Sequence, residues 1–205
     1  MSLYDKYILP KLLNSACGSP PVEYQRKKVV PLCSGEVLEI GIGSGLNLPF
    51  YNLSHVKTVR GIDPSKELQK MALKKAFELG MEIDFMIGGA EEIPLPSNSI
   101  DTVLLTYTLC TIPEPDQALK EMKRVLKDKG RLIFCEHGEA PDEEISKWQK
   151  RINPFWKKIA GGCNLNRDIT GLIERSGFKI DELDNMYLPN TPKIAAFNYW
   201  GSARL

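Results

Sequence analysis

The stretch Val37-Leu38-Glu39-Ile40-Gly41-Ile42-Gly43-Ser44-Gly45 decides the fold. It begins as an apolar strand and continues into a loop where alternate glycines let the backbone turn sharply and approach a ligand with no β-carbon in the way. A second short apolar segment, residues 59–62, ends at Asp63, eighteen residues beyond Gly45. A carboxylate at that distance along the chain is suited to bind ribose hydroxyl groups. Together the two segments predict a nucleoside-binding site.

Apolar segments alternate with segments of helical spacing along the chain, which predicts parallel strands joined by crossover helices. Strands are expected near residues 36–41, 57–62, 82–87, 100–106 and 131–136. Two later strands, near 178–184 and 194–203, flank a turn that contains Pro189-Asn190-Thr191-Pro192 and are expected to form an antiparallel hairpin. The predicted fold class is therefore α/β, with a Rossmann-like, doubly wound sheet of seven strands.

The amino end is expected to be helical. Leu3, Tyr7 and Leu13 belong to an amphipathic stripe, and residues 22–33 have the pattern of a second helix that leads into the sheet. We expect residues 1–33 to form a helical cap on the domain edge. A short amphipathic helix can also lie on a membrane surface, so peripheral membrane contact is left open.

Two later helices have recognisable ends. Ser65 can cap a helix that stops at Gly80, and the apolar stripe of residues 119–126 is expected to end at Gly130. Between 138 and 176, Trp148, Phe155 and Trp156 lie in a stretch of helical pattern that is followed by the turn Gly161-Gly162, which predicts an inserted helical roof. The length of 205 residues fits a single domain that spans residues 1–205.

The composition argues against several classes of partner. The chain has 27 basic and 26 acidic residues, so it lacks the broad positive field that nucleic-acid phosphates require. The run Arg26-Lys27-Lys28 is typical of a solvated helix face. No leader pattern and no apolar run of 18 residues is found, which predicts a cytoplasmic protein without an integral membrane segment.

The cysteines suggest neither disulfides nor a metal site. Five of them occur, at positions 17, 33, 110, 135 and 163, with no Cys-x-x-Cys pair, and His55 and His137 are the two histidines of the chain. No metal is therefore expected.

The spacing of the glycines indicates which ligand the loop binds. A dinucleotide loop of the form Gly-x-Gly-x-x-Gly needs a glycine where Leu46 stands, and a P-loop needs a lysine at the same place. Glu39 lies two residues before the first glycine. Its carboxylate would repel a pyrophosphate but suits a ligand with an ammonium and a sulfonium group, such as S-adenosylmethionine.

The chain resembles the class I, seven-strand S-adenosylmethionine-dependent methyltransferases, in particular their type 11 group. Residues 39–45 match the family's acidic residue followed by Gly-x-Gly-x-Gly, and Asp63, residues 90–94 and residues 99–101 follow in the family's order. The resemblance implies S-adenosylmethionine as cofactor and S-adenosylhomocysteine as its product.

The resemblance also implies roles for individual residues. The glycine loop would contact the methionine part of the cofactor, Asp63 the ribose, and residues 88–91 the adenine. Because Gly89 stands where many members have an aspartate, backbone groups near Ala90 would contact the adenine amine. The expected cofactor-binding residues are Glu39, Gly41, Gly43, Ser44, Gly45, Asn47, Asp63, Pro64, Gly89, Ala90, Glu91 and Thr106.

The expected acceptor is a small molecule. Residues 106–110 lack the Asn/Asp-Pro-Pro-aromatic motif of exocyclic-amine methyltransferases and the Pro-Cys of cytosine methyltransferases. Residues 108–112, 136–137 and 161–167 resemble stretches of the methyltransferase-like alkyl-thiol methyltransferases, which are membrane-associated. The likeness covers roughly residues 35–180 and excludes the amino end, so it does not imply membrane attachment. It implies a hydrophobic thiol as acceptor. Quinone-type and lipid-amine acceptors are the alternatives, because related small methyltransferases share these motifs.

Methyl transfer depends mainly on alignment and on exclusion of water, so a base is optional. His137, just past the fifth expected strand, is the candidate catalytic base, although a histidine bonded to nearby backbone fits equally well. The side chains expected to line the acceptor pocket are Tyr51, Tyr107, Cys110, Trp148 and Cys163. Each of these also suits a core position.

Two other classes of function stay open on the sequence alone. The chain could be a non-catalytic regulator that binds S-adenosylmethionine, or an oxidoreductase that binds a dinucleotide. The sequence does not indicate the oligomeric state.

Overall fold

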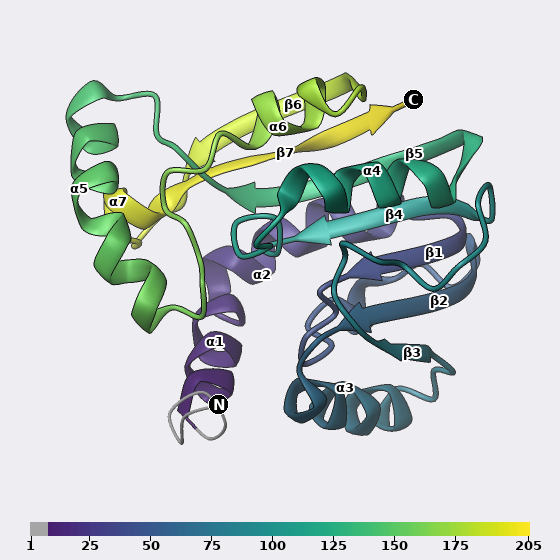
Figure 1. Ribbon diagram of the computed structural model, residues 1–205. Helices are drawn as coiled ribbons and strands as arrows, with labels where there is room; N and C mark the ends of the chain where they lie inside the picture. The colour runs from purple at the N-terminus through teal and green to yellow at the C-terminus, as the bar shows by residue number, and fades with distance from the viewer. Residues whose placement is uncertain (1–7) are drawn as a thin grey trace.

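The computed structural model describes residues 8–205, which are built around one seven-stranded sheet (Figure 1). The strands are β1 (Gly35–Ile40), β2 (Val56–Asp63), β3 (Asp84–Ile87), β4 (Ile100–Thr106), β5 (Leu126–His137), β6 (Lys179–Tyr187) and β7 (Phe197–Arg204). Their order is β3-β2-β1-β4-β5-β7-β6. The first five strands pair in parallel, and β7 lies antiparallel between β5 and β6. The predicted fold class and the C-terminal hairpin are confirmed.

The strand order places a crevice next to β1. From β1 the chain winds outward through β2 to β3, then crosses back to β4 on the other side of β1 and winds outward again. At such a reversal the connections from the two central strands run to opposite sides of the sheet, which leaves a crevice for a ligand at the carboxyl ends. The loops after β1, β2 and β4 are therefore expected to surround the site.

Helices cover both faces of the sheet, as the doubly wound prediction requires. The elements are α2 (Pro20–Val29), α3 (Lys66–Glu78), α4 (Pro115–Val125) and α6 (Ile169–Arg175). Val37 and Leu104 pack in one core with residues of α2 and α3, whereas their neighbours Leu38 and Leu105 pack in another with residues of α4 and α6. Successive side chains of a strand point to opposite faces, so this alternation buries both sides of the sheet.

The remaining elements are α1 (Leu9–Cys17), α5 (Glu143–Ile159), α7 (Lys193–Ala196) and the short 3-10 turns η2 (Val30–Leu32) and η3 (Leu48–Phe50). Helix α1 meets the turn after α5, where Gly161 lies so close to Leu9 that an added β-carbon would be 3.1 Å from it. The start of the expected amino-terminal helix, with Leu3 and Tyr7, lies outside the described residues. Within residues 8–205, no helix combines the length and apolar character needed to cross a membrane.

Several sequence expectations are wrong in detail. Helix α4 ends at Val125, not at Gly130, because the backbone of Leu126 is extended and pairs with Ile100 as the start of β5. The last strand begins at Phe197, since the residues after Pro192 form the turn of α7.

Two expected crossover helices are also absent from the described chain. The link between β1 and β2 contains only η3, and the link between β3 and β4 contains no helix. Glycines and prolines in both links disfavour helix. In the segment expected to form a roof, α6 packs on the sheet, because Ile169 and Ile173 belong to the hydrophobic core. Within this segment only α5 contributes no residue to that core.

Candidate functional site

The glycine loop leaves β1 in a conformation that requires glycine. Gly41, Gly43 and Gly45 all have positive φ angles, of 66°, 55° and 73°. A β-carbon on Gly41 would overlap the side chain of Thr108, so the loops after β1 and β4 touch at this point. At Gly43 the nearest atom to an added β-carbon is 3.7 Å away, and the space beside it is open. The loop therefore presents bare backbone to a cavity.

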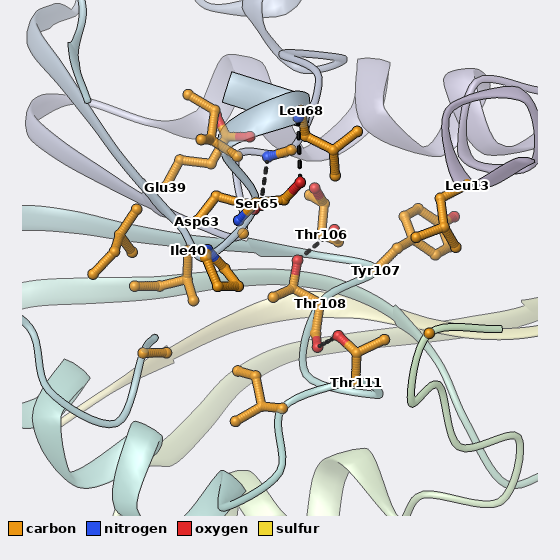
Figure 2. Close-up of a pocket in the computed structure, with 18 of the residues that line it drawn as sticks. Leu13, Glu39, Ile40, Asp63, Ser65, Leu68, Thr106, Tyr107, Thr108 and Thr111 are labelled. Atoms are coloured by element: carbon orange, nitrogen blue, oxygen red, sulfur yellow. Dashed lines mark hydrogen bonds between the residues drawn. The ribbon is translucent and has the colours of Figure 1, made fainter. Parts of the chain in front are cut away.

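Asp63 ends β2 and lines the same cavity beside the glycine loop. Its Oδ2 accepts a hydrogen bond from the backbone N–H of Gly43 at 2.9 Å, and its Oδ1 accepts one from Ser65 at 2.8 Å. Ser65 in turn caps α3 through the N–H of Leu68, as predicted (Figure 2). Each carboxylate oxygen can accept a further bond, so Asp63 can bind a diol while it holds the loop. Burial raises the pKa of its carboxyl group.

Glu39 lies at the centre of a buried polar network. Its carboxylate accepts hydrogen bonds from Tyr51 Oη at 2.6 Å and from Asn47 Nδ2 at 2.9 Å. Arg26 donates to Asn47 Oδ1 and to Thr106 Oγ1, both at 2.7 Å. Burial raises the pKa of Glu39 to about 7, against the lowering effects of Tyr51, Arg26 and Asn47. A cationic ligand beside this carboxylate would favour its charged form.

Arg26 was expected at a solvated surface, and that expectation is wrong. The residue is 5% exposed, and it lines the same cavity as Glu39. Its position in α2 is three and four residues before Val29 and Val30, which are both core residues. That spacing places Arg26 on the inward face of the helix, and it is the feature of the sequence from which the burial of Arg26 can be predicted.

These groups surround a cavity of about 400 Å³. Figure 2 shows Glu39, Asp63 and Ser65 on one side, Thr106, Tyr107 and Thr108 in the middle, and Leu13 from α1 on the other side. The size is that of a typical small-molecule site. Of the expected cofactor-binding residues, those that line the cavity are Glu39, Gly41, Gly43, Ser44, Asp63, Pro64, Gly89, Ala90, Glu91 and Thr106. Gly45 and Asn47 lie behind them, against α3 and Glu39 respectively.

Sequence reasoning missed part of the wall. Leu9, Asn14 and Cys17 of α1 line the cavity, as do Thr111 and Ile112 of the loop after β4. The sequence pattern of this helix is amphipathic, but it does not show which surface the helix covers. The contact of Leu9 with the turn at Gly161 and the hydrogen bond from Ser44 Oγ to Asn14 Oδ1 hold α1 over the site.

Of the residues expected at the acceptor pocket, one lines the cavity and the others lie behind its wall or at the surface. Tyr107 lines the cavity, with its Oη bonded to Asn198 at 2.6 Å and the Arg26 guanidinium 5.2 Å from its ring centre. Tyr51 lies behind Glu39. Trp148 is 54% exposed on α5 because the buried face of that helix carries Ser146 and Gln149, so the expectation that it walls the pocket is wrong.

His137, Cys110 and Cys163 form a separate group behind the cavity wall. His137 Nε2 lies 3.0 Å from Cys163 Sγ, and the three ligand atoms are all within 4.8 Å of one another. A hydrogen bond from the Cys110 thiol, together with His137, holds the pKa of Cys163 well below its usual range. Burial lowers the pKa of His137, but the Cys163 thiolate outweighs it and the pKa is raised. Thr111 and Gly161, rather than these three residues, line the cavity.

Comparison with known proteins agrees with the sequence motifs. A family model described as a methyltransferase domain matches residues 38–134. The thiol S-methyltransferase TMT1B of Rattus norvegicus is 34% identical over 152 residues, which are 72% of this chain and 62% of that protein. The Homo sapiens TMT1B is 32% identical over 172 residues, 78% of this chain and 70% of that protein.

A phosphatidylethanolamine N-methyltransferase of Cereibacter sphaeroides is 37% identical over 123 residues, 59% of this chain and 60% of that protein. The chain thus spans 60–70% of the length of these three relatives. Among solved structures, the [4+2]-cyclase SpnF has a TM-score of 0.73 at 19% identity, covering 98% of this chain and 93% of its own. At that identity the likeness shows a shared fold and not a shared reaction.

Proposed function

The chain belongs to the class I S-adenosylmethionine-dependent methyltransferases, and from that premise we propose that it methylates the sulfur of a small hydrophobic thiol. The observation that carries the proposal is the cavity formed by the glycine loop, Asp63 and Glu39, with the apolar α1 side chains of Leu9 and Leu13 in its wall. The 32% identity with human thiol S-methyltransferase TMT1B over 78% of the chain favours sulfur as the acceptor atom.

The residues present fit the methyl donor. Asp63 would hold the ribose, since its two oxygens keep free lone pairs, and the cavity-lining backbone at Gly41 and Gly43 would contact the amino-acid part. Glu39 would offset the positive charge of that part. Gly89 and Ala90 line the cavity without a long side chain, so their backbone would contact the adenine. S-adenosylmethionine, when bound, supplies a methyl carbon activated by a positive sulfur.

The chain's own contribution is to position a thiol and keep out water. A thiol pKa of about 8.5 leaves a few per cent as thiolate at neutral pH, and a nearby cation raises that fraction. Arg26 is such a cation in the cavity wall, and Leu9, Leu13 and Ile112 supply apolar surface for an alkyl chain. This arrangement needs no dedicated base, and His137 lies outside the wall.

The first test is turnover with matched acceptors. We expect the chain to form S-adenosylhomocysteine from S-adenosylmethionine with an alkyl thiol at least about tenfold faster than with the amine or phenol of equal length. Asp63→Ala should lose donor binding because the ribose contacts are gone, whereas Asp84→Ala, an exposed aspartate on β3, should keep it. Chromatographic detection of the product and calorimetry of S-adenosylhomocysteine binding provide the two readouts.

A lipid amine is the second candidate acceptor, favoured by the likeness to a phosphatidylethanolamine N-methyltransferase. Preference for an aminolipid over the thiol in the same assay would select it. Donor binding without turnover on thiols, amines, phenols and quinols would instead indicate a regulatory protein and would end the enzyme proposal.

We also propose that the chain works in a reducing compartment such as the cytoplasm, in peripheral contact with membranes. All five cysteines are free, which supports the first point. On the outer face of α5, Trp148, Phe155 and Ile159 are 54%, 73% and 59% exposed, and Lys147 and Arg151 lie on the same helix. An apolar stripe with basic neighbours suits an anionic lipid surface.

A further inference from the structure

Three side chains of types that can ligate a metal ion converge from segments that are far apart in the sequence. Cys110 follows β4, His137 is the last residue of β5, and Cys163 lies in the turn after α5. One ligand atom from each lies within 4.8 Å of the other two. Cys110 is 2% exposed and Cys163 is 7% exposed, so both sulfurs are held inside the protein.

The backbone around the group is fixed by hydrogen bonds that do not involve its ligand atoms. Asn164 donates from both its backbone N–H and its Nδ2 to the carbonyl of Cys110, each at 2.9 Å. Arg167 donates to the carbonyls of Leu109 and Ile112, on either side of Cys110, at 2.6 and 2.7 Å. These bonds tie the loop after β4 to the segment that carries Cys163. The convergence is therefore built into the fold.

The ligand atoms have the spacing that a tetrahedral ion requires. Zinc binds cysteine sulfur at about 2.3 Å and histidine nitrogen at about 2.0–2.1 Å, which separates neighbouring ligand atoms by roughly 3.5–3.8 Å. The observed separations are 3.0 Å between His137 and Cys163 and at most 4.8 Å within the group, so they bracket that value.

The charge of the ligands also suits a divalent cation, because two thiolates would balance a charge of +2. Thiolate is a soft ligand and imidazole suits zinc, copper, iron and nickel, so this set favours zinc and related ions over magnesium or calcium. Trp156 Nε1 is 3.4 Å from Cys163 Sγ, which gives that sulfur a neighbouring N–H donor.

We propose that Cys110, His137 and Cys163 bind one zinc ion. Three protein ligands leave a fourth tetrahedral position for an exogenous ligand such as water or a thiol sulfur. The site lies behind Thr111 and Gly161, which line the main cavity. The inference rests on the ligand set and holds whichever acceptor the enzyme uses.

The test is a metal titration of the reduced, metal-free chain, kept reduced with a phosphine. In competition with a chromophoric chelator, one zinc ion per chain should bind with a dissociation constant below micromolar. Cobalt(II) in place of zinc should give the near-ultraviolet charge-transfer absorption of thiolate ligation. Cys110→Ser and Cys163→Ser should each weaken zinc binding at least about 100-fold, while Cys33→Ala, a buried cysteine outside the group, should bind as the wild type does.

Absence of zinc uptake by the folded wild type would overturn the proposal, and so would undiminished binding by both serine variants. Cobalt binding without charge-transfer absorption would assign the ion to oxygen or nitrogen ligands elsewhere and would also overturn it. The wild-type cobalt spectrum decides the matter even if a variant fails to fold. Circular dichroism and S-adenosylhomocysteine binding verify the fold of each variant.

Discussion

Arg26 and Glu39 are buried ionisable residues that shape the site, and their burial also lowers the stability of the fold. Both are almost fully buried, and Asn47 links them through hydrogen bonds to each. The network holds a carboxylate in a cavity wall where a cationic ligand can bind. Without that ligand, burial of the charged form costs free energy, and this cost is why the pKa of Glu39 rises to about 7.

The pH dependence of stability follows from that shift. Because the folded-state pKa of Glu39, about 7, is above its ordinary value of 4.5, the favourable contribution exists at low pH and is lost as pH rises from 4.5 to 7. Arg26, Tyr51, Asp63 and Cys33 face this carboxylate and modulate the effect. We expect the free energy of unfolding of the ligand-free wild type to fall by up to about 3 kcal/mol across this window through Glu39.

Urea unfolding of Glu39→Gln between pH 5 and 8 measures the contribution of Glu39. The free energy of unfolding of the variant should change less with pH than that of the wild type. Glu82→Gln, at an exposed position, serves as the matched control and should reproduce the wild-type profile. An equally steep profile in Glu39→Gln would show that the carboxyl group does not titrate in this range.

Among the elements, α5 carries two faces with different tasks. On the inner face Gln149 donates to the carbonyls of Gly138 and Ile194 and accepts from the N–H of Ala140, which anchors the helix beside the end of β5. On the outer face the apolar side chains of Trp148 and Phe155 are exposed. The sequence showed aromatic residues at helical spacing, but only the packing showed which face was already occupied.

The double variant Trp148→Ser/Phe155→Ser tests the outer face. We expect its partition onto vesicles that contain anionic lipid to fall at least about tenfold, since each buried aromatic side chain contributes roughly 1.5–3 kcal/mol. Phe77→Ser, which removes an 87% exposed aromatic residue from α3, should not change the partition. Vesicle sedimentation provides the measurement, and equal binding by all three proteins would contradict the membrane-contact proposal.

At the scale of the whole molecule, the cavity lies at the carboxyl ends of the strands, where the strand order reverses, and α1 lines part of it. Ligand binding should therefore stabilise the entire fold. S-adenosylhomocysteine at 100 times its dissociation constant should raise the free energy of unfolding by about 2.7 kcal/mol, because only the folded chain binds it. A thermal-shift titration measures this, with NADH as the control ligand. Stabilisation by NADH but not by S-adenosylhomocysteine would favour an oxidoreductase.

The local sequence determined the strands, the glycine loop and Asp63, because a run of buried apolar residues, positive φ angles and a strand-ending carboxylate each leave a short-range signature. The tertiary structure decided which distant groups meet. It buried Arg26 beside Glu39, placed α1 over the cavity and turned Trp148 to the outside. It also brought Cys110, His137 and Cys163 together, although their spacing along the chain matches no metal-binding motif. Such contacts depend on how helices pack across the sheet, and this information is spread over the whole chain rather than held in any one segment.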